Sequence, residues 1–198
     1  MGGMVKVSEP NILDAASTYV SKTGIFEVEG ITISVKPENY KPGIEGIGLF
    51  IPLIPLSFGQ PVIREGLDFN VVVQFETIKQ SFTFHPNEVA LTLKGKKYVP
   101  IAVIGPILNR QQAQETQSAL PGHKWFCNYN DNDFSINGLT ESSTVSTGCY
   151  VLKFSTITPE PEQQFSIKIN GLYRDGHQIE IPLLDFSGKS HGMFFFLG

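Results

Sequence analysis

Residues 69–100 read FNVVVQFETIKQSFTFHPNEVALTLKGKKYVP, and this stretch decides the fold class. Apolar side chains alternate with other residues along it, at Phe69, Val71, Val73, Phe75, Phe82, Phe84, Val89, Leu91 and Leu93. A period of two residues is typical of antiparallel strands that place one face on a core and the other in water. The pattern breaks at His85-Pro86-Asn87, and Lys94-Gly95 has the composition of a tight hairpin turn. The stretch therefore predicts several short antiparallel strands.

The same alternation continues outward on both sides, over residues 31–35, 99–103, 149–154, 165–169 and 178–181. The dipeptides Asn170-Gly171 and Asp175-Gly176 separate the later segments, and both have the chemistry of turns with positive φ. Short strands with turns about every eight to twelve residues indicate a sandwich or a barrel. We therefore predict an all-β, antiparallel β-sandwich with at most one or two short helices.

Helical signal is confined to two segments. Residues 110–119 hold good helix formers without an apolar stripe, so they read as a short surface helix or a polar loop. In residues 9–19, Pro10 can stand in the first turn of a helix, and three apolar residues follow on one face. Neither segment can organise a core. One domain over residues 1–198 is the simplest organisation, and a boundary within 110–121 is the alternative.

Composition excludes several classes of protein. The chain has 198 residues, is 41% hydrophobic and carries a net charge of −4. This supports a sizeable core and argues against nucleic-acid binding, which usually needs a basic face. No apolar run reaches the roughly 18 residues of a membrane-spanning helix. The first ten residues lack the apolar centre of a signal peptide, so the chain reads as cytoplasmic or as a mature exported protein without its leader.

The two cysteines bear on this choice. Cys127 and Cys149 can form an inter-strand disulfide in an all-β domain, which would place the protein in an oxidising compartment. Two buried free thiols are the alternative. We favour the disulfide together with export.

A second stretch, residues 46–61, reads GIGLFIPLIPLSFGQP. It is too short and too broken by proline to span a bilayer, and the prolines argue against a central strand. An edge strand or crossover that caps the sandwich is the favoured interpretation. The alternative is an exposed apolar loop that contacts a partner or a membrane surface. Its contact residues would be Phe50, Leu53, Leu56 and Phe58.

Residues 69–100 also resemble the middle of immunoglobulin-like domains in bacterial envelope lipoproteins. Those domains often show a strand, a Phe-x-Pro corner like Phe84-His85-Pro86, a Val-x-Leu strand, and then Gly and Tyr in a turn and strand. The resemblance implies an immunoglobulin-like sandwich and an envelope location, and it carries no functional residues. The antibody-type markers are absent, because Trp125 precedes Cys127 and Thr147 stands where the corner tyrosine would be.

Polar candidates for a ligand site gather before the second cysteine. Asp131 and Asp133, two residues apart, can supply oxygen ligands to calcium, although the glycine of the helical calcium loop is missing. Ordinary turn chemistry also explains them. Trp125 and Tyr129, with the distant Tyr40, can stack on sugars, although core packing is the commoner role for such aromatics. We expect no cofactor unless calcium binds.

Other reaction chemistry finds little support in the chain. Residues 187–190 read Ser-Gly-Lys-Ser, but Leu183 stands where a phosphate-binding loop needs glycine. The four histidines are scattered without metal-ligand spacing, and a Cys–His nucleophile would be abolished by the disulfide. This argues against an enzyme.

We therefore expect a non-enzymatic, exported protein with a binding or structural role in the bacterial cell envelope, periplasmic or held at the membrane by a lipid anchor absent from this chain. One alternative is a carbohydrate-binding or carbohydrate-active domain that uses Trp125 and Tyr129. Another is a protein-interaction or inhibitor domain that pairs through an exposed strand edge.

Overall fold

The structure, a computed structural model, describes residues 2–12, 25–39, 41–43, 68–77, 82–108, 127, 129–140, 143–145 and 148–194. Within these residues the chain forms three sheets in which every strand pair is antiparallel. The helices of the described residues are single 3-10 turns, η1 (Pro86–Glu88), η2 (Asp131–Asp133) and η3 (Asn137–Leu139). The predicted all-β, antiparallel fold is confirmed.

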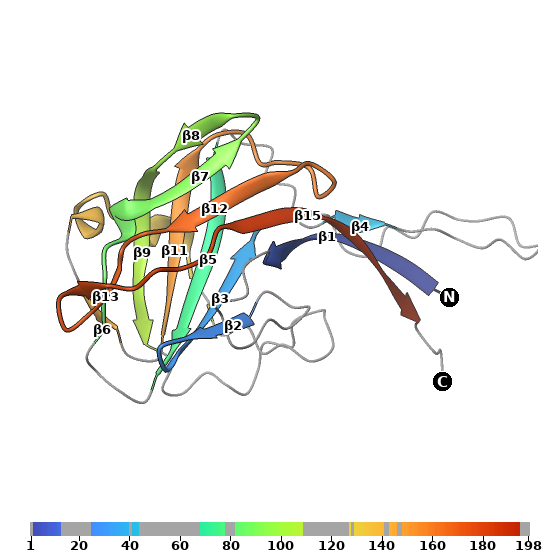
Figure 1. Ribbon diagram of the computed structural model, residues 1–198. Helices are drawn as coiled ribbons and strands as arrows, with labels where there is room; N and C mark the ends of the chain where they lie inside the picture. The colour runs from blue at the N-terminus through green and yellow to red at the C-terminus, as the bar shows by residue number, and fades with distance from the viewer. Residues whose placement is uncertain are drawn as a thin grey trace, which may run out of the picture.

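One layer is a five-stranded sheet with β5 at its centre (Figure 1). Its strands, in spatial order, are β2 (Ile25–Val28), β3 (Ile31–Pro37), β5 (Asp68–Glu76), β11 (Gly148–Ser155) and β9 (Pro100–Leu108). The other layer holds a six-stranded and a four-stranded sheet. The six-stranded sheet is β4 (Lys41–Gly43), β1 (Gly2–Ile12), β15 (Leu184–Phe194), β12 (Phe165–Ile169), β7 (Val89–Leu93) and β8 (Lys96–Tyr98). The four-stranded sheet is β10 (Ser143–Val145), β6 (Phe82–Phe84), β13 (Leu172–Arg174) and β14 (His177–Gln178).

The core lies between the five-stranded sheet and the other two sheets. Alternate residues of β3 and β5 point into it, and the inward residues of β7, β12, β15 and β6 face them. Aromatic rings join the two layers in T-shaped contacts. The ring centres of Phe75 and Phe84 of β6 lie 4.9 Å apart, and those of Phe69 and Phe165 of β12 lie 5.7 Å apart. Such pairs contribute about 0.5–1.5 kcal/mol beyond the burial of their area. The alternating apolar residues of 69–100 therefore form much of the core.

Strands from the two ends of the chain alternate within the sheets. β11 lies between β5 and β9, and β15 lies between β1 and β12. The five-stranded and the six-stranded sheet therefore each contain strands from before residue 109 and from after residue 127. The segment 110–121, named above as an alternative domain boundary and as a helix candidate, lies outside the described residues.

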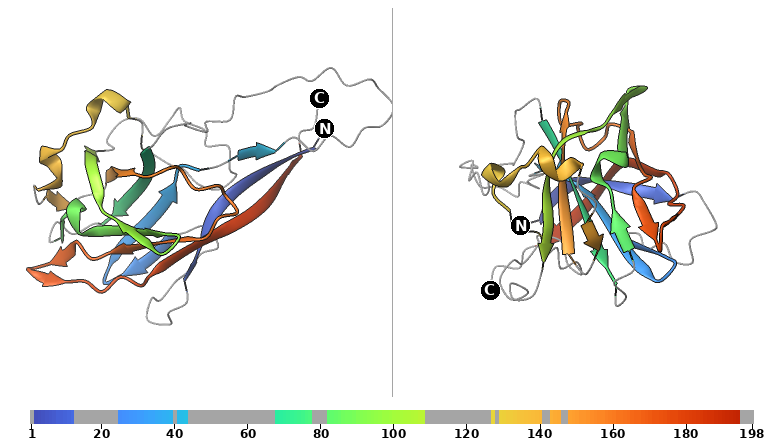
Figure 2. Two further views of the ribbon diagram at one scale, coloured as in Figure 1. Left: turned by 90° about the horizontal axis from the view of Figure 1, so that it is seen from above. Right: turned by 90° about the vertical axis from the view of Figure 1, so that its left-hand side faces the viewer.

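The strands β1 and β15 form the longest ladder of the described chain. They pair over eleven residues, from Gly2 opposite Phe194 to Ile12 opposite Leu184. β12 pairs with β15 at Leu184–Phe186 alone, and β4 pairs with β1 at residues 4–6. The outer halves of β1 and β15 therefore extend away from the sandwich, as Figures 1 and 2 show. We call residues 2–8, 41–43 and 188–194 the ribbon.

Two of the predicted turns have residues with positive φ. Lys94 and Gly95 have φ of 51° and 75°, and Asp175 and Gly176 have φ of 51° and 81°, so both predicted hairpin turns are confirmed. Gly171 does not have positive φ, and that part of the prediction is wrong. Glycine is needed there for a different reason. A Cβ atom at Gly171 would lie 2.1 Å from the carbonyl oxygen of His85, so this crossing admits no side chain.

The helix predicted at residues 9–19 is wrong over residues 9–12, which belong to β1. The weak local signal, which began at Pro10, is overridden by pairing with β15, where Pro10 lies opposite Phe186. The ladder satisfies backbone groups that an isolated short helix would leave at its ends. Residues 13–19 lie outside the described part of the chain.

Candidate functional site

The outer face of the five-stranded sheet points away from the core, but it is not solvent-exposed throughout. Part of it carries buried apolar residues in place of the polar ones expected on a solvent-facing strand. Val72, Cys149 and Val151 lie on this face and are at most 4% exposed, with Ile104 of β9 at 7%. Residues contributed by β9 and by the segment 127–140 pack on them: Ile107, Cys127, Tyr129 and Phe134. We call these eight residues the outer cluster. The corresponding signal in the sequence is an apolar residue, Val72, at an outward position between the polar residues Asn70 and Gln74.

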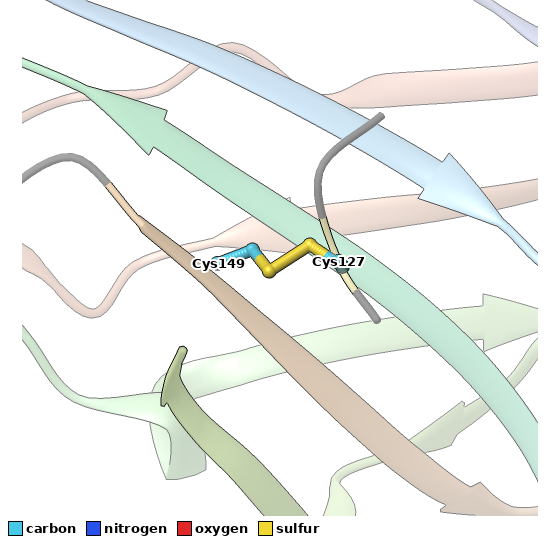
Figure 3. The surroundings of a disulfide bond; sticks show 2 residues. All are labelled: Cys127 and Cys149. Carbon is cyan, nitrogen blue, oxygen red and sulfur yellow. A yellow bond between two sulfur atoms is a disulfide. The ribbon is translucent and has the colours of Figure 1, made fainter. Parts of the chain in front are cut away.

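A disulfide joins residues 127–140, which we call the covering segment, to the five-stranded sheet. Cys127 and Cys149 are bonded, as predicted, with their Cα atoms 6.1 Å apart, within the usual range for such bridges. Cys149 stands on β11, opposite Gln74 of β5 and Ile107 of β9. Figure 3 shows the bond linking the short segment at Cys127 to β11. Neither cysteine has a free thiol, so a Cys–His nucleophile is not available from them.

A hydrogen-bond network fixes the same segment at a second point. The Tyr129 hydroxyl donates to Oε2 of Glu38, just after β3, and accepts from Nδ2 of Asn70 at 3.1 Å. Asn70 is 3% exposed, and its backbone oxygen accepts from the Glu38 N–H at 3.0 Å. Its side-chain Oδ1 is buried and has no hydrogen-bond partner within the described structure. Tyr129 thus serves a structural network that joins β3, β5 and the covering segment.

Two lysines complete the outer face. The Lys153 ammonium lies 4.0 Å from the centre of the Phe134 ring and 3.8 Å from Oδ2 of Asp68. A cation over an aromatic ring contributes about 0.5–1 kcal/mol at a partly exposed site. Burial lowers the pKa of Lys36 from its ordinary 10.5, and the charge of Glu38 opposes that shift. The contact of Lys153 with Phe134 thus joins β11 to the covering segment.

The acidic segment proposed for calcium forms a capped turn. The Asn130 side chain accepts from the N–H of Asn132 at 3.2 Å, and Oδ2 of Asp133 accepts from the N–H of Asn130 at 3.3 Å. This is a capping box around η2, which contains Asp131, and it is the ordinary turn chemistry named above as the alternative. Among the described residues no group of three or more His, Cys, Asp or Glu side chains can hold a metal ion.

Another polar group lies at the end of the sandwich beside η1. The Tyr173 hydroxyl donates to Oε2 of Glu88 at 2.8 Å, and the His85 ring lies 5.0 Å from the Tyr173 ring. The hydrogen bond to Glu88 is the main cause that raises the pKa of Tyr173 above its ordinary 10.0. The phenol, which is protonated at neutral pH even at its ordinary pKa of 10.0, is here a structural hydrogen-bond donor to Glu88.

Several predicted site residues lie outside the described part of the chain. They are the contact residues Phe50, Leu53, Leu56 and Phe58, together with the aromatic residues Tyr40 and Trp125. The apolar contact surface and the tryptophan half of the sugar site therefore stay predictions.

The edges of the sheets differ in how they are protected. β8 carries the exposed Lys96 and Lys97, and β9 has irregular register and contains two prolines, features that discourage pairing with another chain. β15 is different over residues 189–194, where β1 lies on one side and no described strand lies on the other. We call this second side the open edge of β15.

The chain itself explains why β12 stops short of this edge. Pro159 and Pro161 precede β12, and proline lacks the N–H that a ladder requires. The segment instead packs against β1 and β15. The Ser8 hydroxyl donates to the Pro161 oxygen at 2.9 Å, and a Cβ at Gly188 would lie 2.7 Å from that oxygen. The missing side chain at Gly188 thus permits this contact at the base of the ribbon.

Comparison with protein-family models, with curated proteins and with solved structures finds no match for this chain. The resemblance of residues 69–100 to immunoglobulin-like lipoprotein domains therefore stays a prediction. Within the described residues, no helix has the length and apolar character needed to cross a membrane.

Proposed function

We propose that the chain is a non-enzymatic, exported β-sandwich protein that acts in the bacterial cell envelope by binding another protein through a strand edge. The observation that carries this proposal is the open edge of β15, which extends beyond the sandwich alongside β1. A strand edge presents a row of unpaired backbone N–H and C=O groups, and an extended segment of another chain satisfies them by adding a strand.

The disulfide supports export. Disulfides form and persist in oxidising compartments and are rare in the cytosol, and the Cys127–Cys149 bond holds a cover over one face of the sheet. The envelope location and a lipid anchor rest on the resemblance of residues 69–100. The carbohydrate alternative is less well supported, because the Tyr129 hydroxyl is used by the network with Glu38 and Asn70.

Export is tested by counting free thiols in protein taken from its native compartment into an alkylating buffer. We expect none without reductant and two after reduction. Two free thiols before reduction would contradict the proposal.

Binding is tested by a photoreactive residue placed at His191, on the open edge, in cells of the native source. The matched control carries it at Lys97, which is exposed on the protected edge strand β8. We expect a covalent adduct at position 191 alone, with the crosslink mapped to an extended segment of an identified protein. Equal adduct yields at positions 191 and 97 would contradict specific binding at the open edge of β15.

A further inference from the structure

The buried apolar side chains of the described residues form two separate clusters. The main core lies between the layers, and the outer cluster lies on the far side of the five-stranded sheet, beneath the covering segment. Val72, Ile104 and Val151 of the outer cluster stand on β5, β9 and β11, and each of these strands also contributes residues to the main core. Loss of the cover would therefore leave the contacts of the main core in place.

The two ends of the covering segment are attached in different ways. At the later end, Leu139 packs against the main core, and a Cβ added at Gly138 would lie only 2.9 Å from Cγ1 of Val103. At the earlier end, the half-buried Cys127 is joined to β11 by the disulfide with Cys149. The later end is thus held by packing, whereas the earlier end is held by a covalent bond.

Between these ends the covering segment has little regular backbone structure. It forms the turns η2 and η3 and an isolated bridge to β9, in which Val103 and Ser135 exchange two backbone hydrogen bonds. The Tyr129 hydroxyl and the Phe134 ring add side-chain contacts with the sheet. Segments with few backbone bonds to the rest of a protein open at a lower free energy than core strands do. Residues 127–135, which we call the strap, therefore depend on the disulfide more than η3 does.

We infer that the Cys127–Cys149 disulfide is a redox-sensitive switch that closes the strap over the outer face of the sheet. While the bond is intact the strap covers the outer cluster, and when a dithiol reduces the bond the strap opens about a hinge beside η3. The open form exposes Val72, Ile104 and Val151 while the sandwich stays folded. This inference goes beyond the proposed strand-edge function, because it concerns a different surface.

The switch operates by thiol–disulfide exchange, and an external dithiol supplies the two electrons. Cys149 is 2% exposed and Cys127 is half-buried, so the thiolate of the dithiol attacks Sγ of Cys127. This attack forms a mixed disulfide and releases Cys149 as a thiolate, which takes up a proton. The second thiol then displaces Cys127, which takes up the other proton, and the dithiol leaves as a disulfide.

Reduction of the purified full chain under native conditions gives the first test. We expect excess dithiothreitol, without denaturant, to convert both cysteines to thiols that an alkylating reagent modifies. Reoxidation in air after removal of the dithiothreitol should restore the bond, and circular dichroism should remain that of a folded β protein throughout. A bond that resists dithiothreitol until urea unfolds the chain overturns the inference, because the bond would then be purely structural.

Hydrogen exchange locates the opening. We expect the Ser135 amide, which donates to the Val103 oxygen at 2.9 Å, to exchange roughly a hundredfold faster in the reduced chain. The Leu152 amide of β11, a strand paired on both sides, is the internal reference and should keep its rate. Unchanged protection at Ser135 overturns the inference. Equal loss at both amides also overturns it, because the whole sheet would then have opened.

A permanently open variant and a hydrophobic dye test the exposure of the outer face. Cys127→Ala/Cys149→Ala should bind anilinonaphthalene sulfonate with or without dithiothreitol, whereas the unmodified chain should bind more of the dye only after reduction. Leu183→Ala, which removes an exposed leucine outside the outer cluster, is the matched control and should respond to reduction as the unmodified chain does. Equal dye binding by the oxidised unmodified chain and the double variant overturns the inference.

Discussion

Removal of the disulfide should destabilise the protein by about 3 kcal/mol. The bond links residues separated by 22 positions, and closing a loop of that length in the unfolded chain removes an entropy worth about 3 kcal/mol at 25 °C. With a urea m-value of about 2–3 kcal/mol/M for a chain of this size, the unfolding midpoint should fall by roughly 1–1.5 M. The perturbation is the double variant Cys127→Ala/Cys149→Ala, which leaves neither sulfur behind.

The assay is urea unfolding followed by circular dichroism, with the unmodified chain in reductant as a second form of the same perturbation. Reductant should lower the midpoint of the unmodified chain and leave the double variant unchanged, which makes the variant its own control. Hydrogen exchange adds a local measurement. The reciprocal bonds between Val103 and Ser135, at 3.0 and 2.9 Å, attach the covering segment to β9, and their amides should exchange faster without the disulfide.

The reasoning would be refuted if reduction shifted the midpoint by less than about 0.2 M, which corresponds to roughly 0.5 kcal/mol. It would also be refuted if the amides of Val103 and Ser135 kept their protection, since the segment would then be held by its other contacts alone.

Three further changes test the core and the polar groups. Leu91→Ala should cost about 2–5 kcal/mol in unfolding free energy because Leu91 is fully buried, whereas Leu183→Ala, at 46% exposure, should cost less than about 0.5 kcal/mol; chemical denaturation measures both. Tyr129→Phe removes the hydroxyl that bridges two side chains and should cost about 1–3 kcal/mol in unfolding free energy, measured by urea denaturation; an unchanged midpoint would contradict the role of this hydroxyl. Because the pKa of Tyr173 is raised in the folded state, its contribution to stability is complete below pH 10.0 and is lost as pH rises through the raised value. Glu88→Gln should lower the pKa of Tyr173, measured by phenolate absorbance during a pH titration, and an unchanged pKa would contradict the role of Glu88.

The fold class could be predicted because its signal is local. Phe69, Val71, Val73 and Phe75 alternate within one strand, so a short window shows both the period and the buried face. The two-residue turns were equally local, because the glycine marks the turn at Lys94-Gly95 and the positive φ at Asp175-Gly176 follows from the residue types.

The covered outer face could not be predicted in the same way. Val72 is buried beneath a segment more than fifty positions later in the chain, about 127–140, where no periodic pattern marks a third layer. The prediction of positive φ at Gly171 was wrong for a related reason. Its requirement comes from the His85 carbonyl of another segment, which a turn rule cannot include.

The pairing of β1 with β15 has a consequence for the order of folding. β1 is the first described strand and β15 the last, so the long ladder between them joins residues near opposite ends of the sequence. During synthesis, residues 2–12 emerge long before their partner exists, and closing so long a loop is a late and entropically costly step. We expect β1 to wait on the ribosome without its long partner strand, with only residues 4–6 able to pair, to β4, and we expect a folding factor to contact the rest of β1.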